Sequence, residues 1–469
     1  MAIVNRSTFT VDSKARVNRC GEYVPVGSVL ASDVTIGANA MLLGAWVAEG
    51  ALDFHRQLGA RMDEAGRALP REGGAGRPGC GGRSLAVVPV NCRFDHMAVN
   101  QRLRALLEIS EVDIIASYPT SFPADIAERA QIRSFSFSRR VTSIMLKYPL
   151  FGIEAALWAL GKRFAGRRYD FVYTFQDVSA VAGWLLRPYA ARWVMDVLDD
   201  PRQSHGNAAQ RRQRLKLTLL QCYERIVAFL LRRTDVVFTI GIIHDDPLPK
   251  VLAHDYGVAG DRIFPLRQSV DVQLVRDSVG QVVVPESSAP QVSFVGYVSK
   301  LRGVDTLIRA VIALAGRGVD LELVLIGHLN KRDEEWLRAA RQSLPGLRYL
   351  GVLPSSDALR VMSGATVGAL PFPDRRETAP VQAVTGIEYL ALGKPIVATD
   401  LPGARALVDH HVNGILVPPG DAQLMAQAIE EILTNPGLAK EMGEASMKKA
   451  EEFDASIIRK EVIRVLRDS

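Results

Sequence analysis

Short apolar runs alternate with amphipathic segments through the second half of the chain, and this alternation constrains the fold more than any other feature. The runs QVSFVGYV, LELVLIG, LRYLG, TVGALP, PIVATD and GILVPP are predicted as strands. Between them, apolar residues recur with a helical period, as at Val304, Leu307, Ile308, Val311 and Ile312. Strands separated by helices form parallel βαβ units. The second half is therefore predicted as a doubly wound α/β domain.

A similar alternation begins at residue 84, with SLAVVPV, VDIIASYP, DFVYTF, RWVMDVL and TDVVFTIG as predicted strands. A chain of 469 residues exceeds what one core accommodates, so we expect more than one domain. The expected parts are an N-terminal extension with a Gly-rich linker (1–83), a first Rossmann-like domain (84–285), a second one (286–450) and a helix that crosses back to the first (451–469).

Composition excludes several classes of protein. The net charge of +6 is modest, and no dense Lys/Arg block is interleaved with aromatics, so nucleic acid is not an expected partner. The four cysteines, Cys20, Cys80, Cys92 and Cys222, are scattered without a CxxC pair, which favours reduced thiols and no metal. No apolar run approaches the roughly 20 residues of a membrane span. We expect a cytoplasmic protein, with a peripheral position on the inner face of the cell membrane as one option.

Two segments combine apolar faces with basic residues, 138–168 and 211–233. Such a pattern is typical of helices that lie on an anionic membrane surface. Core helices whose Arg and Lys side chains extend to solvent give the same pattern. Both interpretations remain open.

Glycines and cations follow the first strand of the second domain. Gly296 and Gly303 allow close backbone approach, while Lys300 and Arg302 precede a predicted helix. N–H groups, a helix dipole and cations together bind a diphosphate. Taken alone, such a basic pair is better explained as solvated loop charges, and it is the neighbouring loops that favour the binding role.

An acidic residue, Glu388, is predicted in the first turn of its helix, close to Gly386. A carboxylate there is favoured by the helix dipole and can accept two hydrogen bonds from a ribose diol. The alternative role is that of a first-turn capping acid.

Two segments resemble a known family: GIEYLALGKPIVATDLPGARALVDHHVNGILVPPGD (386–421) and VSFVGYVSKLRGVDTLIRA (292–310). They are similar to the C-terminal domain of family-4-type retaining GT-B glycosyltransferases, and the likeness extends over 290–450. The resemblance implies two Rossmann-like domains that face each other across a cleft. It implies transfer of a sugar from a nucleoside diphosphate sugar, UDP- or GDP-linked, to a saccharide or lipid-linked acceptor in polysaccharide or glycolipid synthesis. No metal and no permanently bound cofactor are expected.

By the same resemblance, Lys300 and Arg302 contact the donor diphosphate, Glu388 the ribose, and the backbone at Gly351 and Val352 the base. The donor-binding set is Gly296, Tyr297, Gly303, His328, Gly351, Val352, Glu377, Thr385, Gly386 and Glu388.

The chain also departs from the family pattern. The family commonly has Arg where Tyr297 stands. It often has a first acid eight residues before the second, where Pro380 stands, and Glu377 is a candidate replacement. Some branches place a Lys at the position of Thr385.

The first domain contributes acids after two predicted strands, Asp177 and the pair Asp199 and Asp200. Together with Lys300 and Arg302, we assign Asp177 and Asp200 to the catalytic set, in which they orient sugar hydroxyls. Turn formation and N-capping are alternative roles for such acids. Two histidines in post-strand loops, His96 and His328, are further candidates.

Two other functions share this architecture. A nucleotide-sugar 2-epimerase needs additional acids and histidines, and the chain has only 8 His. A catalytically inactive binding protein is motivated by Tyr297 and Pro380. Sugar transfer to an added acceptor distinguishes the three.

Overall fold

The computed structural model describes residues 82–89, 98–116, 122–134, 150–161 in part, 168–176, 179–198, 224–240, 247–279, 289–375 and 383–468. These residues fall in one unit, Gly79–Ser469. Residues 1–81, which hold the expected extension and nearly all of the expected linker, lie outside the described residues. Residues 82 and 83, which were expected to be linker, instead open the first strand, where the Arg83 N–H donates to Asp170 Oδ2 over 2.9 Å.

The first sheet is parallel, in the order β3-β2-β1-β4-β5-β6-β7. Its strands are β1 (Gly82–Val88), β2 (Ser110–Ala116), β3 (Gln131–Ser134), β4 (Tyr169–Phe175), β5 (Ala190–Val197), β6 (Val236–Ile240) and β7 (Ile263–Leu266). Chain order reverses between β1 and β4, which pair with Ala86 opposite Tyr173. Most of these strand residues are buried, as expected for a parallel sheet covered on both faces.

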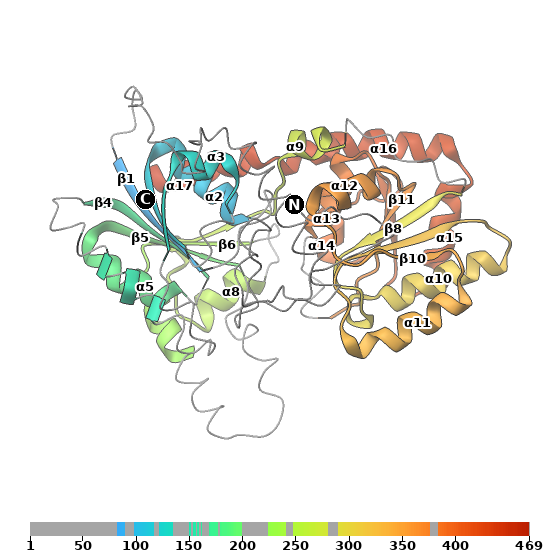
Figure 1. Cartoon of the computed structure of the whole chain (residues 1–469), viewed down its shortest axis with the longest axis horizontal. Coiled ribbons are helices and arrows are strands. Elements are labelled where there is room, and N and C mark those ends of the chain that lie inside the picture. The colour runs from blue at the N-terminus through green and yellow to red at the C-terminus, as the bar shows by residue number, and fades with distance from the viewer. Residues whose placement is uncertain are drawn as a thin grey trace, which may run out of the picture. The chain divides into compact units, whose positions relative to one another are not determined.

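Helices cover both faces of this sheet (Figure 1). One apolar cluster joins the strands to α2 (Ala98–Ile109), α3 (Ala124–Arg129) and the C-terminal helix α17 (Ala455–Asp468). The other joins them to α5 (Ala180–Leu186), α8 (Pro247–His254) and the helical residues 224–231. The helix predicted over 211–233 is described only from residue 224 onward.

The second sheet is also parallel, in the order β10-β9-β8-β11-β12-β13. Its strands are β8 (Gln291–Val295), β9 (Glu322–Ile326), β10 (Leu347–Tyr349), β11 (Val367–Leu370), β12 (Ile396–Thr399) and β13 (Gly414–Val417). Its helices are α10 (Val304–Gly316), α11 (Glu334–Ser343), α12 (Ser355–Ser363), α13 (Val384–Ala391), α14 (Pro402–Arg405), α15 (Ala422–Leu433) and α16 (Pro436–Ala450). Two parallel α/β domains confirm the predicted fold class.

The chain passes twice between the two sheets, and the two passes are bonded to each other. Val270 N–H donates to Phe453 O over 3.1 Å, and Ala455 N–H donates to Val270 O over 2.8 Å. The Asp454 carboxylate accepts from Ser456 N–H (2.9 Å) at the start of α17 and from Val272 N–H (3.2 Å) at the start of α9 (Val272–Asp277). The Asp454 side chain therefore caps α17 and also binds the first N–H of α9, whose own N-cap is Asp271.

α17 then packs on α2 through its apolar face, which buries Ile458, Val462, Val465 and Leu466.

The first domain buries an ion pair between α2 and β5. Arg102 Nε lies 3.0 Å from Asp196 Oδ2, and both side chains are at most 2% exposed. Tyr173 donates its hydroxyl to the same oxygen over 3.3 Å. Burial raises the pKa of Asp196, which the Arg102 guanidinium partly offsets.

Candidate functional site

The carboxyl ends of β8 and β11 form the switch point of the second sheet. β8 lies between β9 and β11, so the connections that follow β8 and β11 leave the sheet in opposite directions. In open α/β sheets, ligands bind in the crevice at such a point. The loops that follow β8, β9, β10 and β11 are therefore the candidate site.

Backbone contacts hold three of these loops together. Gly296 N–H donates to Ile326 O (2.9 Å), Val298 N–H to His328 O (2.9 Å) and Gly327 N–H to Gly351 O (2.7 Å). A Cβ atom on Gly327 would lie 1.9 Å from Gly296 O, so only glycine permits this approach. We call this set of contacts the glycine frame.

The two predicted cations follow the frame. Lys300 and Arg302 form one 3₁₀ turn, and Gly303, at φ 75°, leads from it into α10. Lys300 is exposed and Arg302 is partly buried. Asp305, in the first turn of α10, lies 3.6 Å from Arg309 one turn further along. This pairing partly neutralises Asp305, which is the acid nearest to Lys300 and Arg302 in the sequence.

Each cation lies over an aromatic ring that the sequence did not single out. Lys300 Nζ is 5.7 Å from the centre of the Trp336 ring, and Arg302 Cζ is 5.7 Å from the centre of the Phe372 ring. Trp336 belongs to α11 and Phe372 follows β11. No sequence pattern indicated these pairs, because apolar aromatics at such positions are ordinary core residues.

Two side chains beside the glycine frame are exposed to solvent. Tyr297 is 55% exposed and Val352 is 69% exposed. The Tyr297 ring meets His328 edge-on, with 5.4 Å between ring centres and 77° between planes. The structure therefore brings two residues of the predicted donor set, from adjacent loops, into contact.

Glu388 does not lie in the first turn of its helix, and that part of the prediction is wrong. α13 already begins at Val384, with Thr385 and Gly386 in its first turn, so Glu388 is in the second turn. The helix dipole therefore favours its charge less than the sequence suggested. Glu388 is only 5% exposed, and its charge helps burial to raise the pKa of the adjacent Tyr389.

Several predicted residues lie outside the described residues. These are His96, Asp177, Asp199 and Asp200 of the first domain and Glu377 and Pro380 of the second. The contacts of the three aspartates with sugar hydroxyls, the acceptor-side role of His96 and the role of Glu377 as the replacement acid stay predictions.

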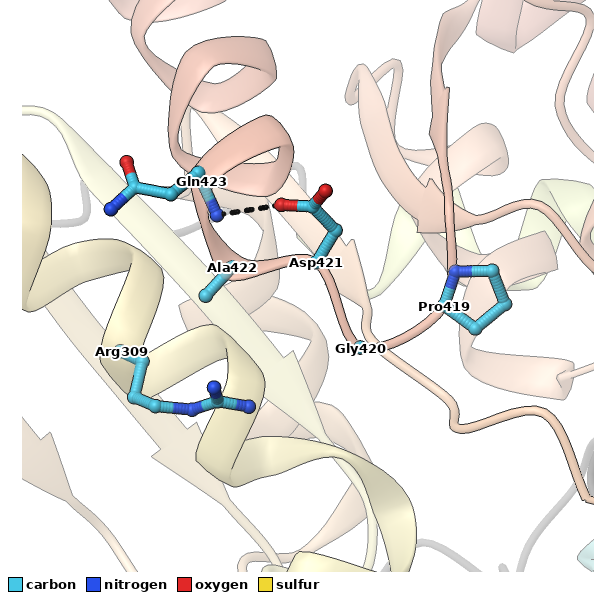
Figure 2. Close-up of a pocket in the computed structure, with 6 residues that line it drawn as sticks. All are labelled: Arg309, Pro419, Gly420, Asp421, Ala422 and Gln423. Atoms are coloured by element: carbon cyan, nitrogen blue, oxygen red, sulfur yellow. Dashed lines mark hydrogen bonds between the residues drawn. The ribbon is translucent and has the colours of Figure 1, made fainter.

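A cavity of about 560 Å³ opens elsewhere on the second domain, and no predicted site residue lines it. Figure 2 shows Arg309 of α10 beside the segment Pro419–Gln423, which leads into α15. Asp421 already accepts hydrogen bonds from Gln423 N–H (3.0 Å) and Leu424 N–H (2.9 Å). Because the protein itself satisfies this helix N-terminus, we do not assign the cavity to a phosphate.

Within the described part of the chain, no three His, Cys, Asp or Glu residues are grouped so as to hold a metal ion. In the same residues, no helix is both long and apolar enough to cross a membrane.

Two doubly wound domains with a returning C-terminal helix define the GT-B fold, and solved structures agree. Sucrose-phosphate synthase from Thermosynechococcus elongatus superposes with a TM-score of 0.63 at 19% identity, over 82% of this chain and 98% of that one. The Anabaena protein HepE in complex with UDP-glucose superposes with a TM-score of 0.59 at 16% identity, over 83% of this chain and 100% of that one. At these identities the likeness shows the fold.

Residues 289–435 match the sequence model of the family described as Glycosyl transferases group 1. A phosphatidyl-myo-inositol mannosyltransferase of Mycobacterium leprae is 28% identical, over 38% of this chain and 49% of the relative. An alpha-D-kanosaminyltransferase of Streptomyces kanamyceticus is 30% identical, over 33% of this chain and 39% of the relative. The chain thus spans half or less of these relatives, and the residues that match the family model include the candidate site.

Proposed function

We propose that the protein is a glycosyltransferase that moves a sugar from a nucleoside diphosphate sugar to a hydroxyl acceptor. The observation that carries the proposal is the placement of Lys300, Arg302 and the N-terminus of α10 together at the switch point of the second sheet. The family match and the two named transferases support it.

In this proposal the diphosphate is the leaving group, and its charge grows as the bond to the sugar breaks. The positive charges of Lys300, Arg302 and the helix N-terminus stabilise that negative charge. They lower the barrier because they are already in position before the reaction begins. Glu388, close to the start of α13, accepts hydrogen bonds from the ribose. The backbone at Gly351 and the exposed Val352 contact the base.

We further propose retention at the anomeric carbon, with a diphosphate oxygen taking the proton from the acceptor. No described side chain at the site is placed as a nucleophile. The donor nucleotide is UDP or GDP, and UDP is supported by the solved HepE complexes with UDP and UDP-glucose.

The test combines nucleotide binding with transfer. Differential scanning fluorimetry of the wild type with UDP, GDP and ADP should show a rise in melting temperature with one of them, because a ligand that binds only the folded state stabilises it. Glu388→Gln should reduce that rise, whereas Glu444→Gln, at an exposed position of α16, should leave it unchanged. If no nucleotide shifts the wild type, the proposed site is wrong.

Transfer from the identified donor to added saccharide or lipid acceptors then separates the functions. A glycosyltransferase yields a glycosylated acceptor, and the anomeric configuration of the product tests retention. A 2-epimerase changes the free nucleotide sugar without an acceptor. A nucleotide that binds without any product indicates an inactive binding protein.

We also propose that a lipid-linked acceptor is met at a membrane surface. In the first domain, Ile226 is 50% exposed and Phe229 is 46% exposed on one helix, and the Arg233 guanidinium lies 3.5 Å from the centre of the Phe229 ring. Apolar side chains beside cations suit an anionic lipid surface. Cosedimentation with phosphatidylglycerol vesicles should exceed that with phosphatidylcholine and should fall in Phe229→Asn but not in Ile457→Asn, a comparably exposed site on α17. Equal sedimentation of both variants would contradict this surface.

A further inference from the structure

Lys300 and Arg302 are long side chains, yet each lies over a ring from a neighbouring segment, helix α11 for Lys300 and the loop after β11 for Arg302. Trp336 comes from the β9 side of β8, and Phe372 comes from the β11 side. A cation within about 6 Å of a ring centre is attracted to the ring face. Both distances, 5.7 Å, satisfy that limit. The two rings therefore restrain the cations from opposite sides of the switch point.

Both rings are fixed in place by the rest of the domain. Trp336 is partly buried against the apolar cluster of the second sheet. Phe372 is 9% exposed, and its carbonyl oxygen accepts a hydrogen bond of 2.7 Å from the Thr399 hydroxyl at the end of β12. A Cβ atom on Gly303 would lie 1.7 Å from Pro371 O, so the start of α10 sits directly against the Phe372 loop. Arg302 and the Phe372 ring thus belong to two segments, the start of α10 and the loop after β11, that pack directly against each other.

Holding the cations in advance has a specific effect on anion binding. A free Lys or Arg side chain carries roughly 2 kcal/mol of rotamer entropy, part of which is lost when it binds phosphate. A ring under the cation removes some of that freedom before the ligand arrives, while the N–H groups at the edge stay available. Positioned charge of this kind stabilises a developing negative charge without reorganisation.

We propose that Trp336 and Phe372 are positioning residues that fix Lys300 and Arg302 for contact with the donor diphosphate. This inference rests on the proposed function. It assigns to two aromatic residues a role in phosphate recognition that requires no contact between them and the nucleotide.

The experiment measures dissociation constants of UMP and UDP, or of GMP and GDP if guanine is the base, by titration calorimetry. Trp336→Leu and Phe372→Leu should each weaken diphosphate binding about two- to fivefold, while monophosphate binding changes less. Trp336→Phe keeps a ring and should stay within about twofold of the wild type. The control is Phe171→Leu, which removes a ring 5.9 Å from the Arg192 guanidinium in the first domain. This control should change neither constant.

A double-variant cycle tests whether Trp336 acts through the cation. After Lys300→Met, the further change Trp336→Leu should have no effect on UDP affinity if the ring works only by holding Lys300. If Trp336→Leu weakens UMP and UDP equally, or weakens UDP equally with and without Lys300, the ring is a structural residue and the inference fails while the proposed function stands. If the wild type binds no nucleotide, both fall.

Discussion

Replacement of Gly303 by alanine should destabilise the protein and damage nucleotide binding together. At φ 75° Gly303 is in the left-handed region, which costs other residues about 1–2 kcal/mol. The new Cβ would stand 1.7 Å from Pro371 O. Since carbon and oxygen atoms in contact stay roughly 3.3 Å apart, the Pro371 carbonyl would have to retreat by roughly 1.6 Å.

That retreat is resisted, because the Thr399 hydroxyl holds the next carbonyl, Phe372 O, at 2.7 Å. Overpacking of this kind costs about 1–3 kcal/mol, so the total is about 2–5 kcal/mol. Gly318→Ala is a matched control. Its φ is 81°, but no atom lies within 4 Å of the added Cβ, so only the backbone cost of about 1–2 kcal/mol remains.

The assay is differential scanning fluorimetry of both variants with and without the nucleotide that binds the wild type. For a domain of 150–250 residues, each kcal/mol moves the melting temperature by about 2–4 °C, so Gly303→Ala should melt about 2–12 °C below Gly318→Ala. The rise caused by nucleotide should be lost in Gly303→Ala and kept in Gly318→Ala. Equal melting temperatures with equal nucleotide shifts would refute the reasoning.

Two further predictions concern stability away from the site. Burial raises the pKa of Asp454, but the hydrogen bonds from Ser456 and Val272 outweigh it and hold the pKa below its usual 3.8. Its contribution is therefore complete above that pH and is lost as the pH falls through the lower value. Asp454→Ala should cost about 0.5–2 kcal/mol near pH 7 through loss of the α17 cap and of the bond to Val272 N–H, and thermal melts should show the difference from wild type shrinking below pH 3.8; a constant difference would contradict it. Arg102→Met should cost about 3–5 kcal/mol by leaving the buried Asp196 carboxylate without its cation, and adding Asp196→Leu should recover part of that loss in chemical denaturation; a further loss would count against it.

The sequence predicted the second domain well because its signals are local. Each buried strand is followed within two or three residues by glycine, proline or a polar residue, and the period of α10 is visible from Val304 to Ile312. The position of Lys300 and Arg302 between the first strand of this domain and the helix that follows it was also predicted. The order of the strands, and with it the switch point, comes from the structure.

What the sequence could not predict depends on contacts between distant residues. Trp336 meets Lys300 across 36 positions, and Phe372 meets Arg302 across 70, with no spacing rule to indicate either pair. The position of Glu388 within its helix was predicted wrongly because the N-cap residue of α13, Ala383, has no polar side chain to indicate where the helix begins. Helix starts of that kind carry no local signal.

The glycine frame has a practical consequence for testing the proposed donor site. It is held by main-chain hydrogen bonds from Gly296 to Ile326, from Val298 to His328 and from Gly327 to Gly351, which do not depend on the side chains at these positions. Tyr297, His328 and Val352 project from it into solvent and can be randomised together without disturbing the fold. A library built on those three positions explores ligand choice on a rigid scaffold, whereas one that includes Gly327 would consist mostly of misfolded members.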